Sequence, residues 1–436
     1  MKPLSQINTR PLTRKELEPP TTLVQDFARI RNLLAGQASG MTLDHTLGNQ
    51  LINLLLCKMY DERTTNPDDV VKFQSLPGEN LDDLVERLNS LFSAIKTLPE
   101  IGSLFSKEEA ISLTGELLVN IVKVLQSFEL THAKRDVIGE AFESFIGPSL
   151  RGNEGQFFTP RNVVELTCRM INPKPGEVVL DPACGTGGFL TQAIRYFDTE
   201  RDEIRVFGID KDSFLARVAA VQIGFMKNES DSWAFSGNSL EHHHRWPHIA
   251  AQKIKMGSID AIMTNPPFGA KIPVNGDFLD QFELGFSWKK NHKTHKWMKG
   301  EKLSMGRPPQ ILFIERCLEL LRPGGRLGIV LPDSVLGNDS MGYVRDFIKQ
   351  KADIVAVIDL PLETFLPSTS TKTSLLFLRK KANNISQKRI FMAIAEKCGH
   401  DRRGKPTYQV NGDLEDDFPL IVDHFRKWRT DYAPDF

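Results

Sequence analysis

The sequence predicts an α/β fold, a mostly parallel sheet preceded by a helical region, from three observations. An apolar run, Val178 to Leu180, ends at Asp181 and leads into the glycine-rich turn Gly185-Thr-Gly-Gly188. Apolar residues at helical spacing follow, and strand, tight turn and helix are the first unit of a doubly wound fold. Further strand patterns recur toward the carboxyl terminus, whereas residues 21–132 show helical periodicity and few strand signals. In such a fold the ligand lies beyond the carboxyl ends of the strands.

Composition sets limits on the class of protein. The 436 residues are enough for two domains with a sizeable core. Lysine plus arginine and aspartate plus glutamate number 55 each, so a nucleic-acid surface, if present, must be local. The five cysteines form no Cys-x-x-Cys pair, which argues against structural zinc or disulfides and suits a reducing cytosol. Since we find no signal peptide and no run long enough to span a bilayer, we expect a cytoplasmic protein.

Three segments are predicted: a loose proline-bearing arm over 1–20, a helical domain over 21–130 and the α/β domain over 131–436. In the helical domain, helices are predicted over 44–63, after the N-cap Asn80, and over 115–128. Residues 136–145 are predicted as a helix that leads into the α/β domain.

Seven strands are predicted for the sheet. The first is the run 178–180. The second is 206–210, the fourth is 259–264, the fifth is 326–332 and the sixth is 354–361. Strand seven, 375–378, is expected to run antiparallel to its neighbours. A helix is predicted over 313–321, and the lysine-rich stretch 288–302 is predicted to be one loop.

The glycine turn limits which classes of ligand are expected. The turn lacks the Gly-Lys-Ser/Thr ending of a phosphate-binding loop, and it fits the dinucleotide pattern poorly. An acidic residue before a short Gly-x-Gly suits a ligand with a cationic amino-acid portion, and S-adenosylmethionine is one. Two further motifs accompany the turn: Gly155-Gln-Phe-Phe-Thr-Pro160 upstream of it, and Asn265-Pro-Pro-Phe268 after strand four.

Together these stretches resemble the N6-adenine DNA methyltransferases, and in particular the modification (M) subunits of type I restriction–modification systems. The resemblance runs from about residue 136 to near the carboxyl terminus. It implies a Rossmann-like sheet that binds S-adenosyl-L-methionine, and methyl transfer to N6 of a flipped adenine in double-stranded DNA. It also implies a specificity (S) subunit as partner, with a restriction (R) subunit in the complete system. Many M subunits continue into a further helical tail.

The resemblance implies which residues meet the methyl donor. The upstream motif is expected to contact the carboxylate of the donor, although Thr159 and Pro160 also suit a plain helix start. Asp210, at the end of strand two, is expected to accept hydrogen bonds from the ribose hydroxyls. Asn238 stands where many relatives carry an aspartate that meets the adenine amino group. The expected contacts are Gln156, Phe157, Phe158, Thr159, Pro160, Arg161, Asp181, Ala183, Gly185, Thr186, Gly187, Gly188, Asp210 and Asn238.

The motif Asn265-Pro-Pro-Phe268 suits transfer to an exocyclic amine, whose lone pair is delocalised into the ring. Two acceptors, the Asn265 side-chain carbonyl and the Pro266 backbone carbonyl, would grip the N–H groups and favour a pyramidal nitrogen. Pro266 and Pro267 restrict the backbone and hold these acceptors in place. Phe268 offers a face on which an extruded base can stack. No metal is expected, because the adjacent histidines at 242–244 lack a second ligand cluster and methyl transfer needs none.

Other interpretations stay open. The lysine-rich loop is a candidate for phosphate contact, through Lys289, Lys290, Lys293 and Lys296, or a solvated surface. No region is left over for target recognition, which favours a partner-dependent subunit over a self-contained orphan or type II enzyme. A protein-glutamine or RNA methyltransferase would share the glycine turn and Asn-Pro-Pro, and a non-catalytic scaffold subunit is a further alternative.

Overall fold

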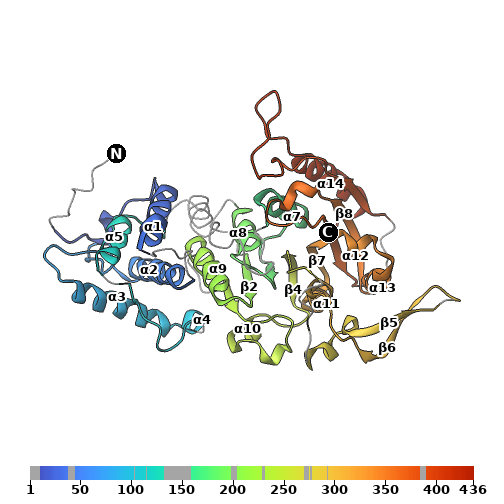
Figure 1. Cartoon of the computed structure of the whole chain (residues 1–436), viewed down its shortest axis with the longest axis horizontal. Helices are drawn as coiled ribbons and strands as arrows, with labels where there is room; N and C mark the ends of the chain where they lie inside the picture. Colours follow the sequence, from blue (N-terminus) through green and yellow to red (C-terminus); the bar gives the residue numbers. More distant parts are fainter. Residues whose placement is uncertain are drawn as a thin grey trace. The chain divides into compact units, whose positions relative to one another are not determined.

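The computed structural model describes residues 10–37, 45–102, 104–113, 115–131, 159–197, 204–227, 231–269, 274, 277–291, 293–382 and 389–436. Contacts divide the chain into two compact units (Figure 1). The first contains Met1–Asn153 and Ser213–Trp233, and the second contains Glu154–Asp212 and Ala234–Phe436. Within the described ranges, no helix is both long and apolar enough to cross a membrane.

The first unit is helical, as predicted. Its helices are α1 (Leu23–Gln37), α2 (His45–Thr64), α3 (Leu81–Lys96), α4 (Pro99–Gly102), α5 (Gly115–Leu125) and α9 (Ser213–Met226). The predicted helix 44–63 is confirmed as α2 and the predicted helix 115–128 as α5. Asn80 is the N-cap of α3, where its side chain accepts a hydrogen bond of 2.9 Å from the backbone N–H of Asp83.

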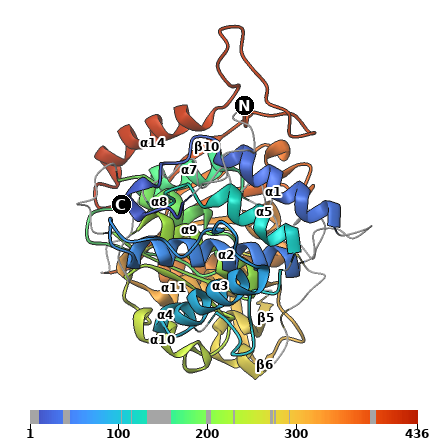
Figure 2. The ribbon, with the colours of Figure 1, turned by 90° about the vertical axis from the view of Figure 1, so that its left-hand side faces the viewer.

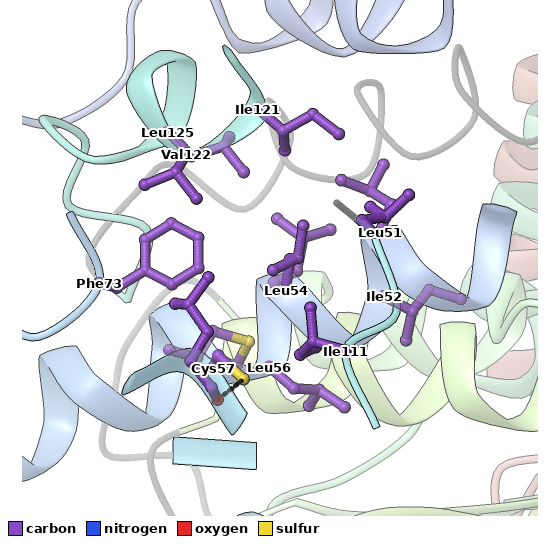
Figure 3. Packing of buried hydrophobic residues seen from close by; sticks show 14 of the residues in the cluster. Leu51, Ile52, Leu54, Leu56, Cys57, Phe73, Ile111, Ile121, Val122 and Leu125 are labelled. Atoms are coloured by element: carbon purple, nitrogen blue, oxygen red, sulfur yellow. Dashed lines mark hydrogen bonds between the residues drawn. The ribbon is translucent and has the colours of Figure 1, made fainter. Parts of the chain in front are cut away.

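The core of this unit is an apolar cluster between its helices. Figure 2 shows α2 and α3 side by side, and Figure 3 shows the side chains that fill the space around α2. Leu51, Leu54 and Leu55 of α2 are each 0% exposed, as Ile121 and Val122 of α5 are. These apolar positions of α2 and α5 are therefore buried as their spacing indicated, and α2 is buried at polar positions too, with Asn53 and Lys58 0% and 1% exposed.

Residues 10–20 differ from the predicted loose arm. Isolated β-bridges join Thr13 to Val70 and Glu18 to Phe128, and Arg14 forms a 2.7 Å ion pair with Glu129. A proline-bearing segment shows no periodicity, yet its backbone groups find partners in loops far along the chain. Residues 1–9 lie outside the described ranges. The predicted boundary at 130/131 adjoins residues 132–158, also outside them, as does the predicted helix 136–145, so both stay predictions.

Among the described residues, the second unit is built on a mostly parallel sheet of eight strands in the order β10-β8-β9-β7-β4-β1-β2-β3. The strands are β1 (Val178–Asp181), β2 (Arg205–Asp210), β3 (Trp233–Ser236), β4 (Ile259–Thr264), β7 (Leu321–Pro332), β8 (Ala352–Asp359), β9 (Thr373–Lys380) and β10 (Phe391–Ile394). The antiparallel direction predicted for strand seven is confirmed, because β9 runs antiparallel to both β7 and β8.

The predicted count of seven strands is corrected to eight by β10, which pairs in parallel with β8. This strand has only four residues, and Met392 and Ile394 are 73% and 75% exposed. Residues 390–395 are all apolar, a run of the length of a short strand, so the sequence carried a signal for β10 that the prediction of seven strands omitted.

Helices cover this sheet, and one of them confirms a prediction. They are α7 (Arg161–Ile171), α8 (Gly188–Arg195), α10 (His248–Lys253), α11 (Pro309–Leu320), α12 (Asp333–Gly337), α13 (Gly342–Lys351) and α14 (Phe418–Tyr432). The helix predicted over 313–321 lies in α11. Short 3₁₀ turns fall at His243–Arg245, Asp277–Gln281, Glu283–Gly285, Asp339–Met341 and Leu362–Phe365.

The stretch 288–302 is a two-stranded hairpin, not the single loop predicted. Its strands β5 (Phe286–Lys290) and β6 (Trp297–Leu303) pair antiparallel and extend away from the main sheet (Figure 1). Tyr343 of α13 anchors them, stacking on Trp288 and meeting the edge of Trp297, each at 5.7 Å between ring centroids. Tyr343 lies about fifty residues further along the chain, so a pattern within residues 288–302 cannot reveal this contact.

Candidate active site

The glycine turn lies at the carboxyl edge of the sheet, between the ends of β1 and β2. Gly185 and Gly187 have positive φ angles of 52° and 88°, which favour glycine. The turn is closed by a hydrogen bond of 2.8 Å from the N–H of Gly187 to the carbonyl of Cys184. A Cβ built on Gly185 would meet nothing within 4 Å, so the backbone here is open to a ligand.

Two buried carboxylates flank this turn. Asp181 ends β1 and accepts a hydrogen bond of 3.0 Å from the N–H of Ala183, while Asp210 ends β2 and accepts one of 2.7 Å from the N–H of Gly185. Burial raises the pKa of the Asp181 carboxyl to about 7 and that of the Asp210 carboxyl to about 6. Such shifts are common at functional sites.

The segment after β3 joins the same edge. The N–H of Gly237 donates to the backbone carbonyl of Asp210 at 2.8 Å, and the Ser239 hydroxyl donates to the carbonyl of Pro182 at 2.5 Å. Asn238 accepts a hydrogen bond of 3.1 Å from the N–H of Leu240. These hydrogen bonds therefore connect three stretches that are separate in the sequence, the segments at the carboxyl ends of β1, β2 and β3.

Asn265 follows β4 directly, and its amide is held from one side. Its Nδ2 donates a hydrogen bond of 3.0 Å to the Thr159 hydroxyl, and its Oδ1 is buried without a partner among the described residues. A buried acceptor without a partner is costly, and it marks a place where a ligand donor fits. Thr159 does not cap α7: Pro160 is the N-cap residue, and no side-chain cap hydrogen bond is present there.

The rest of the motif differs in exposure. Pro266 is buried, Pro267 is exposed and Phe268 is half-buried. The next residue, Gly269, donates its N–H to the side chain of Gln310 on α11 at 3.4 Å. Helix α11 thus supports the segment that carries Asn265.

The other predicted positions divide into three groups. Thr186 and Gly188 lie in the turn and at the start of α8, and Arg161 is the exposed first residue of α7. Gln156, Phe157 and Phe158 lie outside the described residues. The lysines of the hairpin, Lys289, Lys290, Lys293 and Lys296, are all exposed, on and beside its tip.

Sequence reasoning missed two supporting residues, Ser239 and Gln310. Gln310 is 6% exposed and directly precedes the apolar run 311–314 in α11. A polar residue next to such a run was the available signal, because buried amides need partners.

These residues fit S-adenosylmethionine. No lysine or arginine in the described part of the chain pairs with Asp181 or Asp210, and the positive charge of the donor would offset the burial of such carboxylates. Both oxygens of Asp210 accept from backbone N–H groups, of Gly185 and Asp212, and each keeps a lone pair for a hydroxyl donor.

The sheet, the glycine turn and the carboxyl-edge residues define a Rossmann-like protein of the methyltransferase type. Residues 133–432 match the model of the N-6 DNA Methylase family, and the chain belongs to that family.

Individual relatives agree with this assignment. The methylase subunit of the type I restriction enzyme EcoEI from Escherichia coli is 28% identical over 313 residues, which are 69% of this chain and 58% of that protein. The StySJI methylase subunit from Salmonella typhimurium is 25% identical over 76% of this chain and 63% of its own length. The chain thus spans about three fifths of these two relatives.

A solved structure supports the fold. The methyltransferase subunit of the type I restriction–modification system from Streptococcus thermophilus superposes with a TM-score of 0.63. The match covers 95% of this chain and 94% of that one, at 18% sequence identity.

Proposed function

We propose that this chain transfers a methyl group from S-adenosyl-L-methionine to N6 of adenine in double-stranded DNA, as the modification subunit of a type I restriction–modification system. The observation that carries the proposal is the Asn265 amide, whose buried Oδ1 lacks a partner among the described residues. It follows β4 at the edge where the glycine turn also lies. An acceptor in this place suits an amine substrate beside a methyl donor.

The bound donor supplies an electrophilic methyl group, and the chain positions the two reactants. The glycine turn would give the donor close access to the backbone. Asp210 would accept hydrogen bonds from its ribose hydroxyls, and Asn238 is the proposed contact to its adenine. Asp181 places negative charge near its cationic portion. Of the upstream motif, Thr159, Pro160 and Arg161 lie at the start of α7, and Gln156, Phe157 and Phe158 precede them.

The chain must also make the adenine amine nucleophilic. Asn265 Oδ1 accepts one N–H of the amine and the Pro266 carbonyl accepts the other, which favours a pyramidal nitrogen with its lone pair exposed. Asparagine is not a base, so no proton is removed before attack. Phe268 offers a stacking face for a base that has left the duplex, and stacking of this kind contributes roughly 1–3 kcal/mol per base.

DNA and partner contacts complete the proposal. The exposed lysines of the hairpin are the proposed phosphate contacts, and a two-stranded ribbon is narrow enough to enter a major groove. The relatives named above are methylase subunits of type I restriction enzymes. This supports a specificity subunit as the partner that selects the DNA site, with a restriction subunit in the complete system.

The test is single-molecule sequencing of DNA from cells that express the chain alone, or together with its neighbouring genes. N6-methyladenine at a defined site only in the second case is the expected result. Asn265→Ala should abolish it, whereas Asn411→Ala, at an exposed asparagine of the same unit, should not. Methylation by the chain alone would indicate a self-contained enzyme. Labelled methyl transfer to RNA or protein, with none to DNA, would overturn the proposed substrate.

A further inference from the structure

The orientation of the Asn265 amide matters, because its oxygen and nitrogen occupy nearly the same volume. If Oδ1 faces the substrate, the side chain accepts a hydrogen bond from the target amine. If Nδ2 faces it, two N–H donors oppose each other and the grip on the amine is lost. In the structure Nδ2 faces Thr159 at 3.0 Å and Oδ1 is the atom without a partner among the described residues.

We propose that Thr159 is a positioning residue that sets this orientation, and that it does so when the methyl donor is bound. A hydroxyl can donate one hydrogen bond and accept others, so Thr159 alone would tolerate either orientation of the amide. Once its proton is donated to another acceptor, only its lone pairs face Asn265. The amide must then turn Nδ2 toward Thr159 and Oδ1 toward the substrate.

The methyl donor supplies a suitable acceptor, since it carries a carboxylate and Thr159 belongs to the segment proposed to meet it. This step rests on the proposed function. It links binding of the donor to the state of the catalytic amide through one hydroxyl. With the donor in place, the amide would therefore keep the orientation that it has in the structure, with Oδ1 available to the adenine amine.

The surroundings hold Thr159 in position for this task. Pro160 restricts the backbone of the residue before it to extended conformations, and a β-branched side chain has few χ1 choices. Three residues further on, Asn162 donates hydrogen bonds to the carbonyl of Cys398 at 2.9 Å and to the Asp416 carboxylate at 3.1 Å. The start of α7, three residues from Thr159, is thus tied to the segment before α14.

The first test reads the amide directly. Protein with ¹⁵N-labelled asparagine is titrated with S-adenosylhomocysteine, which keeps the carboxylate and carries no methyl to transfer, and Asn265→Asp identifies the signal. Saturation should shift the two Nδ2 proton signals and slow their solvent exchange in the wild type and in Thr159→Ser. Both effects should be absent in Thr159→Val, with occupancy checked by calorimetry. A shift that persists in Thr159→Val would overturn the proposal.

The second test uses a double-mutant cycle on single-turnover methyl transfer at saturating donor. Thr159→Ala should lower the rate about 100-fold, the order expected for loss of one preorganised contact. Thr159→Ser should stay within about threefold of the wild type, and Thr159→Ala should change the residual rate of Asn265→Ala less than about twofold. Rate reductions that multiply would show that Thr159 acts without Asn265. If the wild type methylates no DNA, the proposed function fails and the amide signals still decide the role of Thr159.

Discussion

Gly185 donates its backbone N–H to Oδ2 of Asp210 at 2.7 Å, so the residue that ends β2 holds the turn that follows β1. The other carboxylate oxygen accepts the N–H of Asp212 at 2.9 Å. The same aspartate is the proposed ribose ligand. Its side chain therefore shapes the glycine turn before any ligand arrives, and the two proposed contacts to the donor behave as one structural element.

Substituting Asp210 should test that link. Asp210→Ala removes both acceptors and leaves the Gly185 N–H without its partner, at a cost of about 1–3 kcal/mol. We expect affinity for S-adenosylmethionine, measured by calorimetry, to fall at least about tenfold. The control is Asp260→Asn, which disturbs the backbone N–H of Val178 at the opposite edge of the sheet. An equal decrease in both variants would mean that general unfolding explains the result.

Donor binding should strengthen as pH rises. Burial raises the pKa of Asp181 to about 7 and that of Asp210 to about 6, so both carboxyls are partly protonated in donor-free protein near pH 6. A cationic donor favours their ionised forms, and binding should release protons. Calorimetry in two buffers of different ionisation enthalpy measures this release, and proton uptake would contradict the prediction.

The same shifts affect stability with the opposite sign. A carboxyl whose pKa is raised on folding contributes stability that is present below its unfolded value and lost as pH rises through the folded one. Without donor, Tm should therefore fall as pH rises from about 4 to about 7, and Asp181→Asn should reduce that fall. A Tm profile unchanged by the substitution would argue against Asp181 as the source.

Gly208 in β2 has no room for a side chain. A Cβ there would come within 2.8 Å of Cys184 Sγ and of Leu190 Cδ1. Gly208→Ala should destabilise the protein by about 1–3 kcal/mol, as overpacking does, and displace the turn after β1. Gly337→Ala is the matched control, because a Cβ there meets nothing within 4 Å. Urea unfolding compares the two, and equal midpoints would refute the packing argument.

Neutralising the hairpin should weaken DNA binding in a salt-dependent way. Lys289, Lys290, Lys293 and Lys296 are exposed, and each lysine–phosphate pair that is removed should reduce the slope of log affinity against log salt by about 1. Changing all four to glutamine should flatten the slope in a binding titration at several salt concentrations.

The control for the hairpin is a pair of exposed lysines at the other edge of the sheet. Lys174 precedes β1 and Lys255 precedes β4, so both lie at the amino ends of strands. Their replacement by glutamine should leave the salt slope unchanged. An unchanged slope in the hairpin variant as well would remove the lysines from the DNA surface.

The sequence by itself determined the features that depend on neighbours along the chain. The strand ending at Asp181, the glycine turn and the helices α2 and α5 are local patterns, because apolar residues recur along these elements with a period of 3.6 or in a short run. The residue types of the motif at Asn265 likewise indicated transfer to an exocyclic amine.

Only the tertiary structure decided the rest. The hydrogen bond between Asn265 and Thr159 joins positions 106 residues apart, and the anchoring of the hairpin depends on Tyr343 of another helix. Helix α9 packs in the helical unit although it follows a strand of the sheet. Each of these features arises from contacts between distant segments, which leave no period in either segment alone.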